Sequence, residues 1–206
     1  MNSKILKILE FEQITNRLSS LAITAPAKEK AANLKPKTDF DKVEKSLKQT
    51  LALANLLRIK GQLPLTDFKD VKPSTKRLSV KANLNAQEFG NILLILSLAS
   101  EINGFLEDLD EDIDLSAIDE ILDKLVVPDT LFNQLKKSVD FDGEVLDSAS
   151  SALARIRHDI KSNEEEIKNK MDSYTKGNSS KYLSEQIVTI RDDRYVIPVK
   201  QEYRGK

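Results

Sequence analysis

The sequence predicts a mainly α protein: a helical bundle from which one long helix leads into a short β-hairpin. Six glycines and six prolines among 206 residues are few, which favours helices over a fold rich in turns. Apolar residues recur at helical spacing through most of the chain up to residue 176. Two β-branched runs follow, at 187–190 and 195–199, and they predict the hairpin.

The bundle should begin with two helices. Apolar residues at helical spacing predict the first from Ser3 to about Ala22. Thr24 followed by Pro26 is a start signal for the second helix. That helix should end before Pro36, because proline disfavours the helical conformation in the residue that precedes it.

A long third helix should start after Thr38 or Asp39, either of which can cap it, and it should stop at Gly61. We expect its buried stripe to consist of Val43, Leu47, Leu51, Ala54 and Leu57. Three shorter helices are expected over 74–81, 115–126 and 129–138, the first of them basic.

The most apolar helix should run from Ala86 to about Leu106. Asn85 and Glu88 form an Asn-led variant of the capping box at its start. Because residues 92–96 are apolar on every side of this helix, we expect it at the buried centre of the bundle.

A long helix is predicted over residues 147–176, with Asp147 or Ser148 as its cap. Apolar residues recur every seven positions along it, at Leu153, Ile160, Ile167 and Tyr174. This heptad seam predicts a helix that packs lengthwise against a partner.

The hairpin should turn at residues 191–194. Pro198 has no backbone N–H, so its strand should lie at a sheet edge or carry a bulge. A lone hairpin is only marginally stable in water. Because the sequence stops at Lys206 before a third strand, we expect a fragment that ends inside a β domain.

Charge is unevenly distributed along a chain whose formal net charge is -1. Residues 1–81 carry 17 basic and 8 acidic side chains, residues 82–150 carry 3 and 16, and residues 151–206 carry 12 and 9. A uniformly basic nucleic-acid binder is thereby excluded, but a local basic patch is not. Either the acidic section docks on the basic ones, or the basic ends meet phosphate while the acidic section faces away.

Several kinds of chemistry are excluded by composition. The chain has no cysteine and a single histidine, His158, which excludes thiolate metal sites, thiol nucleophiles and His-rich zinc sites. No pair of glycines has the spacing of a phosphate-binding P-loop. No apolar run approaches the ~20 residues of a membrane span, so we predict a cytoplasmic protein with no membrane contact.

Two acidic constellations do not meet the requirements of a metal or nuclease site. Asp108 to Asp114 alternate like a calcium loop, but Ile113 stands where glycine is needed and Asp119 where glutamate is expected. A second set comprises Glu185, Asp192, Asp193 and Lys200. Its Asp-Asp pair is ordinary turn chemistry. We therefore assign no catalytic, cofactor-binding or metal-ligating residue to this chain.

Basic residues gather on and around the predicted hairpin: Arg191, Arg194, Lys200, Arg204 and Lys206. Arginines at a hairpin tip can reach phosphate oxygens without contacting bases. Lysine and arginine also protect edge strands from aggregation. The residues alone favour neither interpretation, and we take these five as candidate nucleic-acid-binding residues.

Three stretches resemble a known family: Asp142–Ser150, Leu153–Arg157 and Ile187–Gly205. Together they are similar to the N-terminal half of the second bacterial MutS subfamily, the endonuclease type with a C-terminal small-MutS-related (Smr) domain. The opening of the chain fits the same family at Leu9–Phe11, Lys28–Lys30 and Thr38–Phe40. The last of the three stretches is the most specific.

The resemblance implies a MutS-like division of the chain. Residues 1–146 would be the helical core domain, 147–180 the lever helix and 181–206 the truncated start of the β clamp domain. Under this division, the hairpin is the clamp's beginning, and a stiff helix couples it to the rest of the protein. The ATPase and the Smr nuclease, with their ATP and Mg, would lie outside this chain.

The resemblance also implies what the whole protein does. Family members are dimeric ATPases that bind branched DNA independently of sequence and restrain homologous recombination, and some split collided ribosomes, which makes ribosomal RNA a second client. The alternative is a helical scaffold or dimerisation module whose partner is a protein, with no direct contact to nucleic acid.

Overall fold

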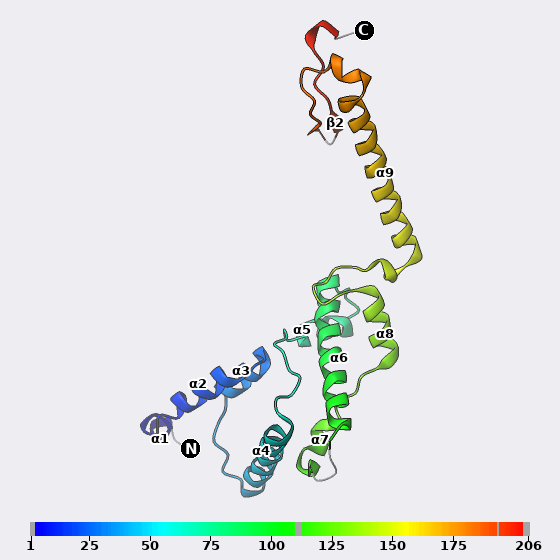
Figure 1. The fold of residues 1–206 in the computed structure, drawn as a ribbon. Helices are drawn as coiled ribbons and strands as arrows, with labels where there is room; N and C mark the ends of the chain where they lie inside the picture. Colours follow the sequence, from blue (N-terminus) through cyan, green and yellow to red (C-terminus); the bar gives the residue numbers. More distant parts are fainter. Residues whose placement is uncertain (1–2, 110–112, 193, 204–206) are drawn as a thin grey trace. The chain divides into compact units, whose positions relative to one another are not determined.

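The computed structural model describes residues 3–109, 113–192 and 194–203, and the chain divides into two compact units (Figure 1). Unit 1 is Met1–Leu146 and unit 2 is Asp147–Lys206. Helices dominate both, and the sheet of the described residues is one two-stranded antiparallel hairpin. The predicted mainly α fold class is confirmed.

Unit 1 begins with three helices, α1 (Ser3–Ile8), α2 (Phe11–Leu21) and α3 (Ala25–Ala32). The prediction of one helix up to residue 22 is wrong, because Glu10 adopts a left-handed conformation with φ of 50° and separates α1 from α2. The predicted start of α3 is confirmed: the Thr24 hydroxyl caps it. Helices α2 and α3 pack against each other.

Helix α4 (Phe40–Lys60) has the predicted ends, with Asp39 as its cap and Gly61 at φ of 84° after it. The predicted buried stripe is wrong, since Leu47 and Leu51 are about 60% exposed while Ala52 and Leu56 are buried. The reason is tertiary: α4 packs on the short helix η1 (Ser116–Ile118), and this contact selects a neighbouring face.

The rest of unit 1 is built around the apolar helix α6. The elements are α5 (Lys72–Ser79), α6 (Ala86–Glu107), α7 (Asp119–Leu122) and α8 (Asp129–Ser138). Helix α6 packs on α8, and Leu93, Leu135 and Val139 form a buried cluster there.

Helix α6 is only partly the buried centre that its sequence predicts. Gly90, Leu93 and Leu98 are buried, but most of its other apolar residues are half-buried. Its length and composition, with a mean hydropathy of 1.5, would also suit a membrane-spanning helix. That similarity is weak evidence, because the core helix of a bundle has the same composition, and the packing of α6 on α8 accounts for it.

A loop of unit 1 approaches α6 so closely that both elements need glycine. A Cβ on Gly90 would lie 2.7 Å from the carbonyl oxygen of Asp140. A Cβ on Gly143 would lie 2.5 Å from the Gln87 Cα, and Gly143 has φ of 82°. The 140–144 loop is therefore seated on the helix backbone itself.

Unit 2 is a long helix followed by a hairpin (Figure 1). After the short helix η2 (Asp147–Ala149), α9 runs unbroken over Ser151–Lys176. The short helix η3 (Asn178–Tyr182) leads to β1 (Thr189–Arg191) and β2 (Arg194–Val196), and η4 (Gln201–Tyr203) follows. The long helix and the hairpin are confirmed, but the predicted cap at Asp147 or Ser148 is wrong: those residues form η2, and Ser150 caps α9.

Candidate nucleic-acid interface

Local contacts fix the start of α9. The Ser150 hydroxyl accepts a hydrogen bond from the Leu153 N–H at 3.1 Å, which caps the helix. One turn further on, Arg157 forms an ion pair with Asp147 at 2.5 Å and so ties the helix to the residues before it. The seam residues Ile160 and Tyr174 are about half exposed, so this face is open to a partner.

The end of α9 passes directly into the base of the hairpin. Thr175 is buried, and its hydroxyl donates to backbone carbonyls of the preceding turn. At Gly177 a side chain would collide with the Ser173 carbonyl oxygen, so the chain needs glycine to leave the helix here. The helix and the hairpin are thus joined by a short, closely packed connection.

The base of the hairpin is held by backbone pairing around the buried residue Leu183, which forms an isolated bridge with Val199. The Ser184 N–H donates to the Pro198 carbonyl at 3.0 Å, and the Lys200 N–H donates to the Tyr182 carbonyl at 3.0 Å. Pro198 thus takes part in the pairing as an acceptor, the role that its missing N–H allows.

The tip of the hairpin brings two arginines together. In the β1–β2 register, Arg191 lies directly opposite Arg194. Asp192 makes the turn with φ of 50°, a left-handed conformation that Asp tolerates better than most residues. Both arginines are exposed, and neither guanidinium group has a hydrogen-bond or ion-pair partner among the residues that the structure describes.

The two faces of the hairpin differ. Side chains alternate along a strand, so Arg191 and Arg194 share one face, and Ile190 and Tyr195 share the other. Ile190 and Tyr195, with Met171 of α9, line a groove of about 540 Å³ between the hairpin and the helix. The apolar face is therefore the one next to α9, and the arginine pair is on the opposite face.

Like charges placed directly opposite each other destabilise a strand pair. An anion between the two guanidinium groups would relieve that repulsion, and a guanidinium presents a planar fork of donors that matches phosphate oxygens. The arrangement at Arg191 and Arg194 can therefore bind phosphate.

The other predicted basic residues lie elsewhere. The Lys200 ammonium group donates to the Lys181 carbonyl at 2.9 Å, at the base of the hairpin rather than its tip. Arg204 and Lys206 lie outside the described residues. Of the five candidates, the structure brings together the two arginines.

The acidic sets assemble no metal site within the described part of the chain, where no cluster of three or more possible ligands is found. Asp192 is at the tip of the hairpin and Lys200 at its base, while Asp193 lies outside the described residues. Part of the Asp108–Asp114 loop, residues 110–112, also lies outside them.

The sequence predicts a basic helix over 74–81 but assigns it no site. Lysines lie within and beside α5, in the section of the chain whose excess of basic residues is largest, and that excess was the available signal. Without the structure, nothing distinguishes these lysines from those that are consumed in ion pairs.

The chain matches known proteins over its whole length. It is 76% identical to the endonuclease MutS2 of Lactobacillus helveticus, 56% identical to that of Lactobacillus johnsonii and 40% identical to that of Ligilactobacillus salivarius. In each case, the alignment covers 100% of this chain and 26% of the relative. No protein-family model matches the chain.

These identities agree with the resemblance carried by the Asp142–Ser150 and Ile187–Gly205 stretches. The chain spans about a quarter of the length of the curated relatives it matches. With these identities over its whole length, the chain belongs to the bacterial MutS2 family.

Proposed function

We propose that this chain is the core, lever and clamp-start segment of a MutS2 protein, and that the hairpin tip holds the phosphodiester backbone of nucleic acid. The observation that carries this proposal is the Arg191–Arg194 pair: two exposed guanidinium groups directly opposite each other, without partners among the described residues. Their mutual repulsion makes this tip favourable for a bound anion.

The division of labour follows the resemblance. Residues 1–146 act as the helical core, 147–180 as the lever and 181–206 as the start of the clamp. The unbroken 26-residue α9 supports the lever role, because a continuous helix transmits displacement along its axis. The packed connection at Gly177 supports coupling between that helix and the hairpin.

The activity of the whole protein is part of the same proposal. The relatives are named endonucleases, and we infer that the full-length protein is a cytoplasmic, homodimeric ATPase and nuclease that uses ATP and Mg outside this chain. Its proposed clients are branched DNA, in the suppression of homologous recombination, and the ribosome, in the rescue of collisions.

The test is a salt titration of duplex DNA binding by the full-length protein. Fluorescence anisotropy gives Kd as a function of KCl for the wild type and for Arg191→Ala/Arg194→Ala. Each lost phosphate contact removes about 0.9 from the slope of log affinity against log salt, so the double variant should lose roughly 2. The loss should be the same for DNAs of different sequence.

A charge-matched control separates the site from the net charge. Arg155→Ala/Lys170→Ala removes two exposed basic side chains of α9 and should change the slope much less. If the arginine variant behaves like this control, the hairpin does not contact phosphate. That result would support the alternative function, in which the chain is a scaffold that binds a protein through the half-exposed seam of α9.

A further inference from the structure

Four exposed lysines of unit 1 lie within α5 or close to its ends: Lys69, Lys72, Lys76 and Lys81, here called the α5 lysines. No hydrogen bond or ion pair holds their ammonium groups within the described part of the chain. The lysines of the neighbouring helix α4 differ in this respect. Lys42 pairs with Asp39 at 3.1 Å, Lys45 with Glu120 at 2.7 Å and Lys48 with Glu44 at 3.1 Å.

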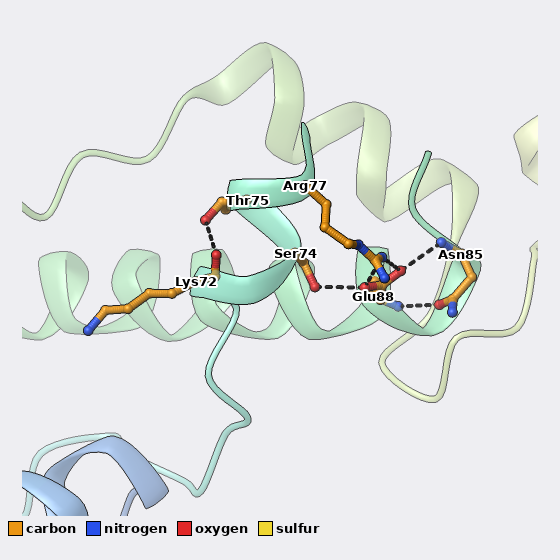
Figure 2. A network of polar contacts seen from close by, with 6 residues as sticks. All are labelled: Lys72, Ser74, Thr75, Arg77, Asn85 and Glu88. Atoms are coloured by element: carbon orange, nitrogen blue, oxygen red, sulfur yellow. Dashed lines mark hydrogen bonds and ion pairs between the residues drawn. The ribbon is translucent and has the colours of Figure 1, made fainter. Parts of the chain in front are cut away.

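The α5 lysines are held on a well-anchored helix. Arg77 and Ser74 of α5 both donate to the Glu88 carboxylate of α6, and Glu88 also forms the capping box with Asn85 (Figure 2). Figure 2 shows Lys72 extending away from this network. Arg77 therefore neutralises the nearby acid, and the lysines remain uncompensated.

The acidic residue closest in sequence, Asp70, forms no ion pair with these lysines among the described residues. The Asp70 carboxylate accepts a hydrogen bond from the Lys72 backbone N–H at 2.9 Å, at the start of α5. This contact orders the backbone and leaves the Lys72 ammonium group, on its four-carbon stem, directed to solvent.

Lys81 occupies a position that the backbone would fill best with glycine. It has φ of 60°, and its N–H donates to the Leu78 carbonyl while the Ala82 N–H donates to that of Arg77. This is the Schellman pattern, in which the left-handed residue is usually glycine. Because lysine is less stable than glycine in this conformation, its presence at position 81 points to a role for its charge.

We infer that the α5 lysines form a second contact surface for a nucleic-acid backbone, separate from the hairpin tip and located in unit 1. Lys72 and Lys76 are one helical turn apart, about 6 Å along the axis. In a duplex, the successive phosphates of one strand rise by about 3.4 Å along the helix axis, and flexible lysine stems adapt to that arrangement. The surface would therefore bind phosphodiester chains without selecting sequence.

The chemistry of these side chains favours a phosphate chain over a folded acidic protein. Lysine ammonium groups act as point charges on phosphate, whereas stable protein interfaces are built on aromatic and arginine anchors. Within 69–81, arginine occurs once, at Arg77, which is paired with Glu88, and aromatic residues are absent. This inference goes beyond the proposed hairpin contact and does not depend on it.

The experiment measures binding of the full-length protein to a duplex DNA and to an RNA duplex of the same sequence, each across a KCl series. Lys72→Gln/Lys76→Gln should lower the salt slope on DNA by roughly 2 and weaken binding about tenfold or more at low salt. The control is Lys42→Gln/Lys48→Gln, which removes the same charge from paired lysines and should change Kd less than about twofold.

A third variant separates charge from structure. Lys81→Gly suits the left-handed backbone, so its Tm should be equal to or above that of the wild type, while its salt slope on DNA should fall by about 1. A residue with a purely structural role would not weaken binding while the protein keeps its stability.

The two duplexes identify the source of the phosphate. A loss on both supports a surface that recognises any backbone, and a loss on one alone names that nucleic acid. If Lys72→Gln/Lys76→Gln matches its control on both duplexes, the inference is wrong, whatever the arginine variant does. The opposite result is also informative. If Arg191→Ala/Arg194→Ala keeps the wild-type salt slope while Lys72→Gln/Lys76→Gln lowers it, the α5 lysines bind nucleic acid and the hairpin proposal is wrong.

Discussion

Glu88 joins α5 to the start of α6 through its carboxylate (Figure 2). That carboxylate accepts hydrogen bonds from the Asn85 backbone N–H at 3.0 Å, from the Ser74 hydroxyl at 2.8 Å and from the Arg77 guanidinium. The bonds from Asn85 and then Ser74 hold the pKa of Glu88 below its usual range. The charged form is therefore the one that stabilises this corner of unit 1.

This pKa shift gives stability a defined dependence on pH. A lowered pKa in the folded state stabilises the protein above the ordinary Glu pKa of about 4.3, and this stabilisation is lost as pH falls through the lowered value. Glu88→Gln should therefore lower the free energy of unfolding at pH 7, and the difference from the wild type should shrink on acidification toward pH 3. Urea unfolding followed by circular dichroism measures both.

Glu101→Gln serves as the control, because Glu101 is an exposed residue of the same helix. It should change the free energy of unfolding little at either pH. A Glu88→Gln effect of equal size at pH 7 and pH 3 would show that the charge of Glu88 is not what stabilises the contact.

Local signals of this kind could be recognised in the sequence. The capping box at Asn85 and Glu88 was predicted, as were a cap at Thr38 or Asp39, of which the structure has Asp39, and the stop at Gly61, because each depends on residues within one helical turn. The pairing of Arg191 with Arg194 could not be recognised in this way, because the sequence predicts a turn over 191–194, whereas β1 ends at Arg191 and β2 begins at Arg194.

What depends on distant residues could not be predicted. The buried face of α4 is set by its contact with η1, about 60 residues further along, and leucines on several sides of α4 made the wrong face equally plausible. The break at Glu10 carries no glycine or proline to signal it. Lys200 lies at the base of the hairpin because Val199 pairs with Leu183. The residues next to Lys200 in sequence do not predict this pairing.

The close approach of the 140–144 loop to α6 predicts that a substitution of Gly143 destabilises unit 1. Gly143→Ala adds a Cβ at 2.5 Å from the Gln87 Cα and also places alanine at φ of 82°. Overpacking against backbone and the left-handed conformation both cost free energy, so we expect a destabilisation of about 2–4 kcal/mol. Urea unfolding of the variant measures it.

Gly104→Ala is the matched control. Gly104 lies in α6, the helix on which the loop is seated, and a Cβ there would meet nothing within 4 Å. Alanine in a helix interior should stabilise the protein by about 0.5–1 kcal/mol. Equal effects of the two substitutions would contradict the close approach of the loop to α6.

In the molecule as a whole, the aromatic residues report separately on the two units. All four tyrosines, at positions 174, 182, 195 and 203, lie in unit 2, and all seven phenylalanines lie in unit 1. The sequence has no tryptophan. Tyrosine fluorescence of residues 1–206 therefore follows unit 2, while circular dichroism at 222 nm sums the helices of both units.

Because packing contacts group within each unit, the two should unfold as separate cooperative steps. Leu56 is 1% exposed, so Leu56→Ala leaves a cavity in unit 1 and should destabilise it by about 2–5 kcal/mol. In urea, the transition of unit 1 in the dichroism signal should then shift to lower concentration, while the tyrosine transition stays where it is in the wild type.

Leu47→Ala, at a 58% exposed site of the same helix, should shift neither transition appreciably. A tyrosine transition that moves together with the dichroism signal in Leu56→Ala would mean that the chain unfolds as one cooperative body, and the hairpin then depends for its stability on the helices of unit 1.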